Sequence, residues 1–139
     1  MVDIESVVER LQALEEYTDH LRNLRQIPFS DVKTDIKNRW AIERGLLLAI
    51  ECILDIGSHI VAEEKLGRPK DYTEIIDILG EKSIIPEEFA KEIRGIAGFR
   101  NILIHEYVEI DIGKVYGYLQ KAPEQFDVFR SYIGKFLKL

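Results

Sequence analysis

The stretch between Pro28 and Gly67 most constrains the fold, because it keeps helical periodicity over a long run that contains no proline. Its apolar residues occupy two adjacent sides of a helix, which is wider than the stripe of about 100° that a surface helix needs. One side carries Ile36, Trp40, Leu47, Ile50, Leu54 and Val61, and the other carries Leu46, Ala49, Ile53, Ile56 and Ile60. The stretch therefore predicts a central helix that is covered on several sides, or one that also faces a second copy of the chain.

The ends of this central helix are marked by residues that start and stop helices. Ser30 could cap its beginning, and Gly67 stops it just after Leu66. Within these limits the pattern allows one long helix, or two pieces broken near Gly45 or Gly57.

Further helical patterns lie on both sides of the central stretch. They predict a helix over residues 3–26, a short helix within 70–85 capped by Thr73, a helix that opens at Pro86, and a final helix from about 112 to 137 that Pro123 kinks or interrupts. Strand-like alternation and internal repeats are absent from the sequence. We expect an all-α, up-and-down bundle of four main helices plus a short extra one, forming a single domain over residues 1–139.

Composition and charge exclude several classes of protein. The chain has 139 residues and a formal net charge of −6, so no global basic field points to nucleic acid. Cys52 is the only cysteine, which excludes an internal disulfide and a cysteine-based zinc site. The acidic start does not resemble a signal peptide, and the run Leu46 to Ile50 is too short to span a bilayer. We expect a cytoplasmic protein that does not associate with a membrane.

Residues 99–107 hold the chemically most informative cluster, with Arg100, His105 and Tyr107 in an otherwise apolar segment. In a helical frame that starts at Ile93, Arg100 and Tyr107 fall on the stripe where core aliphatics are expected. A guanidinium there must be paired or must line a cleft, because an unpaired buried charge is costly. His105 would point about 140° away from Arg100 on an ideal helix, so the helix must end or bend near His105 if one site uses both.

A polar line runs along the central helix through Arg44, Glu51, Asp55 and His59. This spacing lacks the H-E-x-x-H arrangement of zinc enzymes and is more typical of a solvated helix face, so we expect no metal. Glu51 and Asp55 are instead candidates to support a site at Arg100 and His105.

The sequence contains no phosphate-binding glycine loop and no nucleophile elbow. What remains is an arginine that can hold a phosphate and a histidine that can move protons near neutral pH. This pair suits cleavage of RNA by its own 2′-hydroxyl, which requires neither a metal nor a protein nucleophile but does require a base and an acid. One chain offers a single well-placed histidine, whereas a two-fold dimer would bring two into one cleft. Lys33, Lys37, Arg39 and Arg44 could supply a local basic patch.

The segment Arg100-Asn101-x-x-x-His105-x-Tyr107 resembles the R-x4-H-x-Y motif of HEPN domains, in particular those of HepT-type toxins from toxin–antitoxin operons. The resemblance covers nearly the whole chain. It includes the segment Arg39-Trp40-Ala41-Ile42-Glu43-Arg44, the break Leu66-Gly67-Arg68-Pro69, and residues 98–107.

The resemblance implies an all-α homodimer in which the two copies of Arg100 and His105 face one another, with Asn101 in support. It implies a metal-independent endoribonuclease that acts on tRNA or mRNA and needs no cofactor. It also implies an antitoxin of the MntA type, a nucleotidyltransferase that transfers AMP to Tyr107. Two alternatives stay open: a HEPN module that binds nucleotide or protein without cleaving RNA, and a purely structural bundle.

Overall fold

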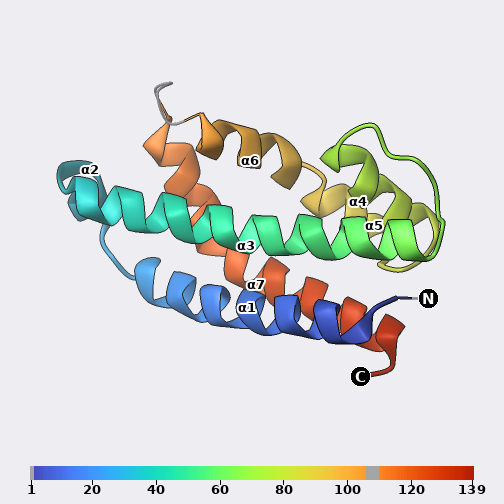
Figure 1. Ribbon diagram of the computed structural model, residues 1–139. Helices are drawn as coiled ribbons and strands as arrows, with labels where there is room; N and C mark the ends of the chain where they lie inside the picture. Colours follow the sequence, from blue (N-terminus) through green and yellow to red (C-terminus); the bar gives the residue numbers. More distant parts are fainter. Residues whose placement is uncertain (1, 106–109) are drawn as a thin grey trace.

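The computed structural model describes residues 2–105 and 110–139, and these residues form helices joined by short connections (Figure 1). The helices are α1 (Ile4–Leu24), α2 (Phe29–Thr34), α3 (Ile36–Glu63), α4 (Tyr72–Glu81), α5 (Glu87–Ile93), α6 (Ile96–Ile104) and α7 (Ile112–Leu137). The predicted all-α bundle is confirmed. The number of helices is larger than predicted, because two of the expected helices are each divided.

Helix α3 is the centre of the bundle, as its two apolar sides predict. It packs against α1, α2, α4, α6 and α7. Eight of its apolar side chains are essentially inaccessible to solvent: Ile42, Leu46, Ala49, Ile50, Ile53, Leu54, Ile56 and Ile60. Ile36 and Trp40, which we expected on the buried side, are instead 52% and 62% exposed.

Helices α1 and α7 pack against one another and against α3, and each is capped by an aspartate. The side chain of Asp3 accepts from the backbone N–H of Ser6, and that of Asp111 accepts from the N–H of Lys114. Such caps satisfy amide groups that have no partner inside the helix.

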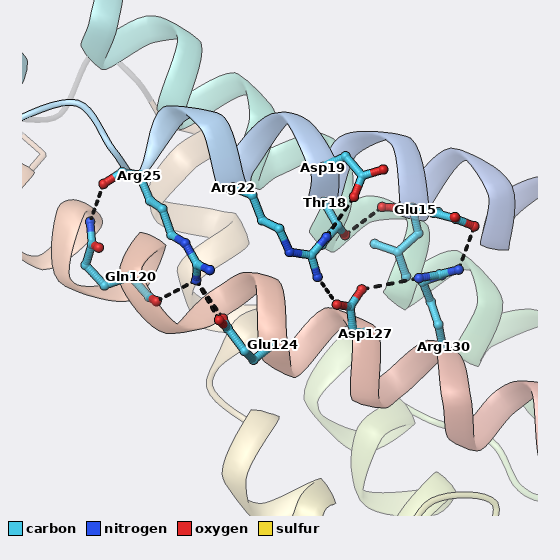
Figure 2. Close-up of polar contacts among 10 residues, drawn as sticks. Glu15, Thr18, Asp19, Arg22, Arg25, Gln120, Glu124, Asp127 and Arg130 are labelled. Atoms are coloured by element: carbon cyan, nitrogen blue, oxygen red, sulfur yellow. Dashed lines mark hydrogen bonds and ion pairs between the residues drawn. The ribbon is translucent and has the colours of Figure 1, made fainter.

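Ion pairs link α1 to α7 along one side (Figure 2). Arg25 reaches Glu124 at 2.7 Å and Arg130 reaches Glu15 at 2.6 Å, while Arg22 pairs with Asp127. Exposed pairs contribute little one by one, so the buried apolar surface remains the main stabilising term.

The predicted central helix is divided near its beginning rather than at a glycine. Asp35 has an extended backbone and its side chain accepts from the N–H of Lys37, so it ends α2 and caps α3. Ser30 lies inside α2 and caps nothing. Both Gly45 and Gly57 lie within the uninterrupted α3, and a Cβ at Gly57 would approach Ile75 to 2.8 Å, so this glycine permits close packing of α4.

Three further boundaries differ from the sequence prediction. The helix that opens after Pro86 is divided at Arg94 and Gly95 into α5 and α6. Asp71 caps α4 in place of Thr73, because the Asp71 carboxylate accepts from the N–H of Glu74. Pro123 does not interrupt α7, which runs continuously to Leu137.

By length and composition alone, α3 could also cross a membrane, and it is the one helix in the described ranges for which this is so. More than half of that apolar stretch, 56%, is buried inside the bundle. The core helix of a bundle has the same composition, so this feature is explained by the fold.

Candidate active site

Helix α6 carries the Arg100 side chain on the side that faces the bundle. Ile96, Ala97 and Leu103 are buried at helical spacing on that side, and Arg100 lies between them. Ile104, the last residue of the helix, is 41% exposed.

The Arg100 guanidinium is paired, as its position predicts. Its Nε donates to Oε1 of Glu51 on α3 over 2.5 Å, and its Nη1 donates to Oδ1 of Asn101 over 3.3 Å. The Arg100 side chain is only 20% exposed and that of Glu51 only 32% exposed, so the pair is partly shielded from water. A charge-assisted bond in such a setting is stronger than one at the surface. The predicted supporting residues Glu51 and Asn101 are therefore in direct contact with Arg100.

A tyrosine that the sequence did not indicate also holds Arg100. The Arg100 guanidinium carbon lies 4.7 Å from the centre of the Tyr72 ring at the start of α4. A cation over a ring face at this distance is attracted by the quadrupole of the ring. Three helices thus converge on one guanidinium: α3 through Glu51, α4 through Tyr72, and α6 itself. No local sequence signal could have identified Tyr72, because the contact depends on how α4 folds back onto α3.

Asp55 lies one turn after Glu51 on α3 and takes part through its charge. Burial raises its pKa, and the neighbouring Glu51 carboxylate raises it further. The positive charges of Arg10 and Arg100 act in the opposite direction. Arg10 of α1 is thus a second residue that sequence reasoning missed. Cys52, beside Asp55, has a pKa raised to about 11 mainly by burial, so its thiol is not a nucleophile at neutral pH.

Helix α6 ends immediately before His105, as required for His105 and Arg100 to serve one site. The His105 backbone leaves the helical region, with φ −85° and ψ 63°, and its N–H still bonds to the carbonyl of Asn101. His105 is exposed. The helix thus ends at the residue where the sequence argument requires a break if one site uses both side chains.

Two other predictions concern the surroundings of this site. Tyr107 lies outside the described residues, so its proposed role stays a prediction from sequence. In the ranges that the structure covers, no group of three or more His, Cys, Asp or Glu side chains could hold a metal ion.

This arrangement of a held arginine and a histidine at a helix end can be compared with known proteins. A family model described as Ribonuclease HepT-like matches residues 11–133. The chain belongs to the ribonuclease HepT-like family. The predicted family is thereby confirmed, and the predicted class of enzyme, a ribonuclease, is confirmed with it.

Relatives of known name agree with the HepT-like assignment. The chain is 32% identical to a protein named tRNA nuclease HepT from Aphanizomenon flos-aquae over 139 residues, which cover 99% of this chain and 95% of the relative. It is 26% identical to a protein named mRNA nuclease HepT from Shewanella oneidensis over 100 residues, or 72% and 75% of the two chains.

A solved structure shows the same HepT-like fold. It is a tri-AMPylated HEPN toxin from Shewanella oneidensis in complex with an MNT antitoxin. The two folds superpose with a TM-score of 0.85 over 97% of this chain and 99% of the other, at 22% identity.

Proposed function

We propose that this chain is the toxin of a toxin–antitoxin pair and acts as a metal-independent endoribonuclease on tRNA or mRNA. The single observation that carries the proposal is the Arg100 guanidinium, fixed by Glu51 and Tyr72 five residues before a histidine at the end of its helix. The nuclease relatives of the chain and the toxin–antitoxin complex of similar fold support it.

Arg100 is suited to hold the phosphate at which RNA is cut. A guanidinium has five N–H donors, and in the described part of the chain Arg100 uses one on Glu51 and one on Asn101. The donors left over include both of Nη2, which can bind a phosphate oxygen. Because Glu51 and Tyr72 fix the plane of the guanidinium, little entropy is lost when the phosphate binds and charge develops on its oxygens.

The reaction needs two proton transfers, and one chain supplies one suitable histidine. We therefore place the site in a symmetric homodimer, in which His105 of each protomer faces the same scissile phosphate. One imidazole takes the proton from the 2′-hydroxyl as its oxygen attacks phosphorus. The bond from phosphorus to the 5′-oxygen then breaks, and the second imidazolium gives that oxygen a proton. The products are a 2′,3′-cyclic phosphate and a 5′-hydroxyl, and no water, metal or protein nucleophile is consumed.

Cleavage of RNA by purified variants tests this proposal. His105→Ala and Arg100→Ala should each slow cleavage by about 10²–10⁴-fold, the usual contribution of a positioned acid–base or charge-stabilising group. Arg94→Ala is the control for the loss of an arginine, because Arg94 pairs with Asp77 and not with Glu51. Wild-type cleavage should continue in excess chelator and yield cyclic phosphate ends. Full activity of a folded His105→Ala protein would contradict the mechanism.

The dimer has its own measurement. Light scattering should give a mass near twice the 16.1 kDa of the chain at concentrations at which RNA is cleaved. An active enzyme that stays monomeric under those conditions would exclude the two-histidine mechanism while leaving the nuclease assignment in place.

The proposed antitoxin is a nucleotidyltransferase of the MntA type that attaches AMP to Tyr107. The relative of similar fold is described as tri-AMPylated and in complex with an MNT antitoxin. In this sequence Tyr107 stands two residues after His105, so an AMP group there would add negative charge and bulk beside the phosphate-binding arginine.

A further inference from the structure

Trp40 is an aromatic side chain in an unusual position. It is the only tryptophan of the chain, and 62% of it is exposed although a core position was expected from its helical phase. Within the described ranges, no ring or cation packs against its indole. A large ring left open to water on a rigid helix is a surface suited to stacking.

Trp40 lies on the same side of α3 as Glu51. The two residues are eleven positions apart, which on an ideal helix is about 20° of rotation and about 16 Å of rise. Helix α6 covers this side of α3 at Glu51 through Arg100, runs in the opposite direction to α3, and ends at Ile104 (Figure 1). The side of α3 that carries Glu51 therefore extends beyond the end of α6 and reaches Trp40.

The exposed charged side chains one turn before and one turn after Trp40 are both positive. Lys37 precedes it by one turn and Arg44 follows it by one turn, and both are exposed. The acidic neighbour Glu43 is buried, at 7% exposure, so its carboxylate is directed away from solvent. In a chain of net charge −6, this combination of two exposed cations and one exposed aromatic ring is a local exception.

We propose that Lys37, Trp40 and Arg44 form a strip that holds a single-stranded segment of the RNA substrate, with one base stacked on the Trp40 indole. This inference rests on the proposed ribonuclease function and adds the substrate class, RNA that is unpaired next to the cleavage site. The strip offers the two elements of single-strand binding, cations for the backbone and an aromatic ring for a base. A duplex fits it poorly, because its bases are already stacked on one another. About 16 Å along α3 separates Trp40 from the Arg100 pair, a span of a few nucleotides.

Fluorescence provides a direct test, since Trp40 is the only tryptophan. The probe is a mixed-sequence 2′-O-methyl RNA of about twelve nucleotides, which lacks the attacking hydroxyl and stays intact; a few nucleotides would cover the strip. We expect this RNA to quench the Trp40 fluorescence saturably, and we expect the binding to weaken as the salt concentration rises. The same RNA annealed to its complement should quench the fluorescence much less. Equal quenching by the duplex, or none by the single strand, would overturn the proposal. So would a blue-shifted emission that follows protein concentration and ignores RNA, because a second copy would then cover the ring.

Substitution at position 40 supplies the second test. Trp40→Ala should raise KM for a cleavable single-stranded RNA by about 5- to 150-fold, the usual contribution of one stacked base, and lower kcat much less. Trp40→Phe should recover most of the loss. Val128→Ala, which trims an exposed apolar side chain on α7, should leave KM unchanged. An unchanged KM for Trp40→Ala, or a loss of the dimer in that variant, would refute stacking.

The two proposals fail in different ways. If wild-type protein cleaves no RNA but its Trp40 fluorescence is still quenched by single-stranded RNA, the proposed cleavage is wrong and the proposed binding strip is supported. If it cleaves single-stranded RNA but RNA does not quench the Trp40 fluorescence, the binding strip is wrong and the ribonuclease proposal is supported.

Discussion

Arg100 and Glu51 lie 49 residues apart in the chain and are joined by a 2.5 Å bond between α6 and α3. The bond anchors the proposed phosphate-binding group to the central helix of the bundle. The nine-residue helix α6 is thus fixed in position by α3, the described helix that packs against the most other helices.

Loss of the Glu51 carboxylate should release Arg100 and reduce activity. We expect Glu51→Ala to lower kcat by about 10- to 100-fold, because misplacement of a catalytic group by an ångström has an effect of that size. Glu51→Gln keeps an amide oxygen as acceptor for the Arg100 Nε and should retain more activity than Glu51→Ala. Single-turnover cleavage rates measure both, with circular dichroism as the check on folding. A wild-type rate for Glu51→Ala would contradict the role of the pair.

Tyr72 should act on Arg100 through its ring and not through its hydroxyl. Tyr72→Phe preserves the ring face and is expected to match wild type in kcat/KM. Tyr72→Leu removes it and should lower kcat/KM by about 2- to 30-fold, the range expected for a cation–π contact. The pair of variants separates this role from simple packing, because both keep an apolar side chain. Equal activity of the two would leave the ring without a function.

Two carboxylates should affect thermal stability in opposite directions. The pKa of Asp55 is raised above 3.8 by burial and by Glu51, so the folded state holds its proton more tightly than the unfolded state. The free energy of unfolding therefore falls as pH rises from 3.8 through the folded pKa, and this loss persists at neutral pH. Asp55→Asn should raise Tm at neutral pH and should change it little at acid pH below 3.8.

Glu124 provides the opposite case. The hydrogen bond from Arg25 lowers its pKa below 4.5, so its charge stabilises the fold above that pH and the benefit disappears as pH falls through the folded pKa. Glu124→Gln should lower Tm at neutral pH and have little effect in acid. Thermal melts of both variants across pH measure these shifts, and a shift of the same sign in the two would refute the assignment.

Tyr107 should be the position at which the antitoxin acts. Co-expression with an MntA-type partner is expected to add one or more AMP groups to the peptide that contains Tyr107, detectable by mass spectrometry. AMP beside Arg100 would occupy the place of a substrate phosphate and block the RNA strand by bulk. Tyr107→Phe should stay unmodified and toxic in the presence of the partner. If the partner silences this variant as well as wild type, neutralisation follows another route.

Local sequence signals predicted the helices well where the residues that define a helix lie within it or next to it in the sequence. The final helix was predicted from about 112 to 137, as observed, because its apolar period defines it. The break at Asp35 was missed since Ser30 also suits a helix start, and the bend at Arg94 and Gly95 was missed since the apolar period of residues 93–97 continues across it.

The candidate site was predicted to the extent that its residues share one segment. The inward position of Arg100 follows from residues 93–105 alone, and Glu51 follows from the polar line on α3. The end of the helix near His105 was expected only on the condition that one site uses both residues. Tyr72 and Arg10 could not be predicted, because they reach the site only through the packing of α4 and α1 on α3.

The pairing of α1 with α7 brings the two ends of the described chain to one end of the bundle (Figure 1), where Leu139 lies beside Val8 and Leu11. A short linker between the termini would therefore disturb no helix, and the chain could be reopened at the exposed residues 67 and 68, before the cap of α4 at Asp71. Such a circular permutant changes the order of the helices along the chain but keeps α3, α4 and α6 packed around the same core. It would separate the contribution of chain order to folding from that of the packed helices, while the end of α6 stays far from the new join.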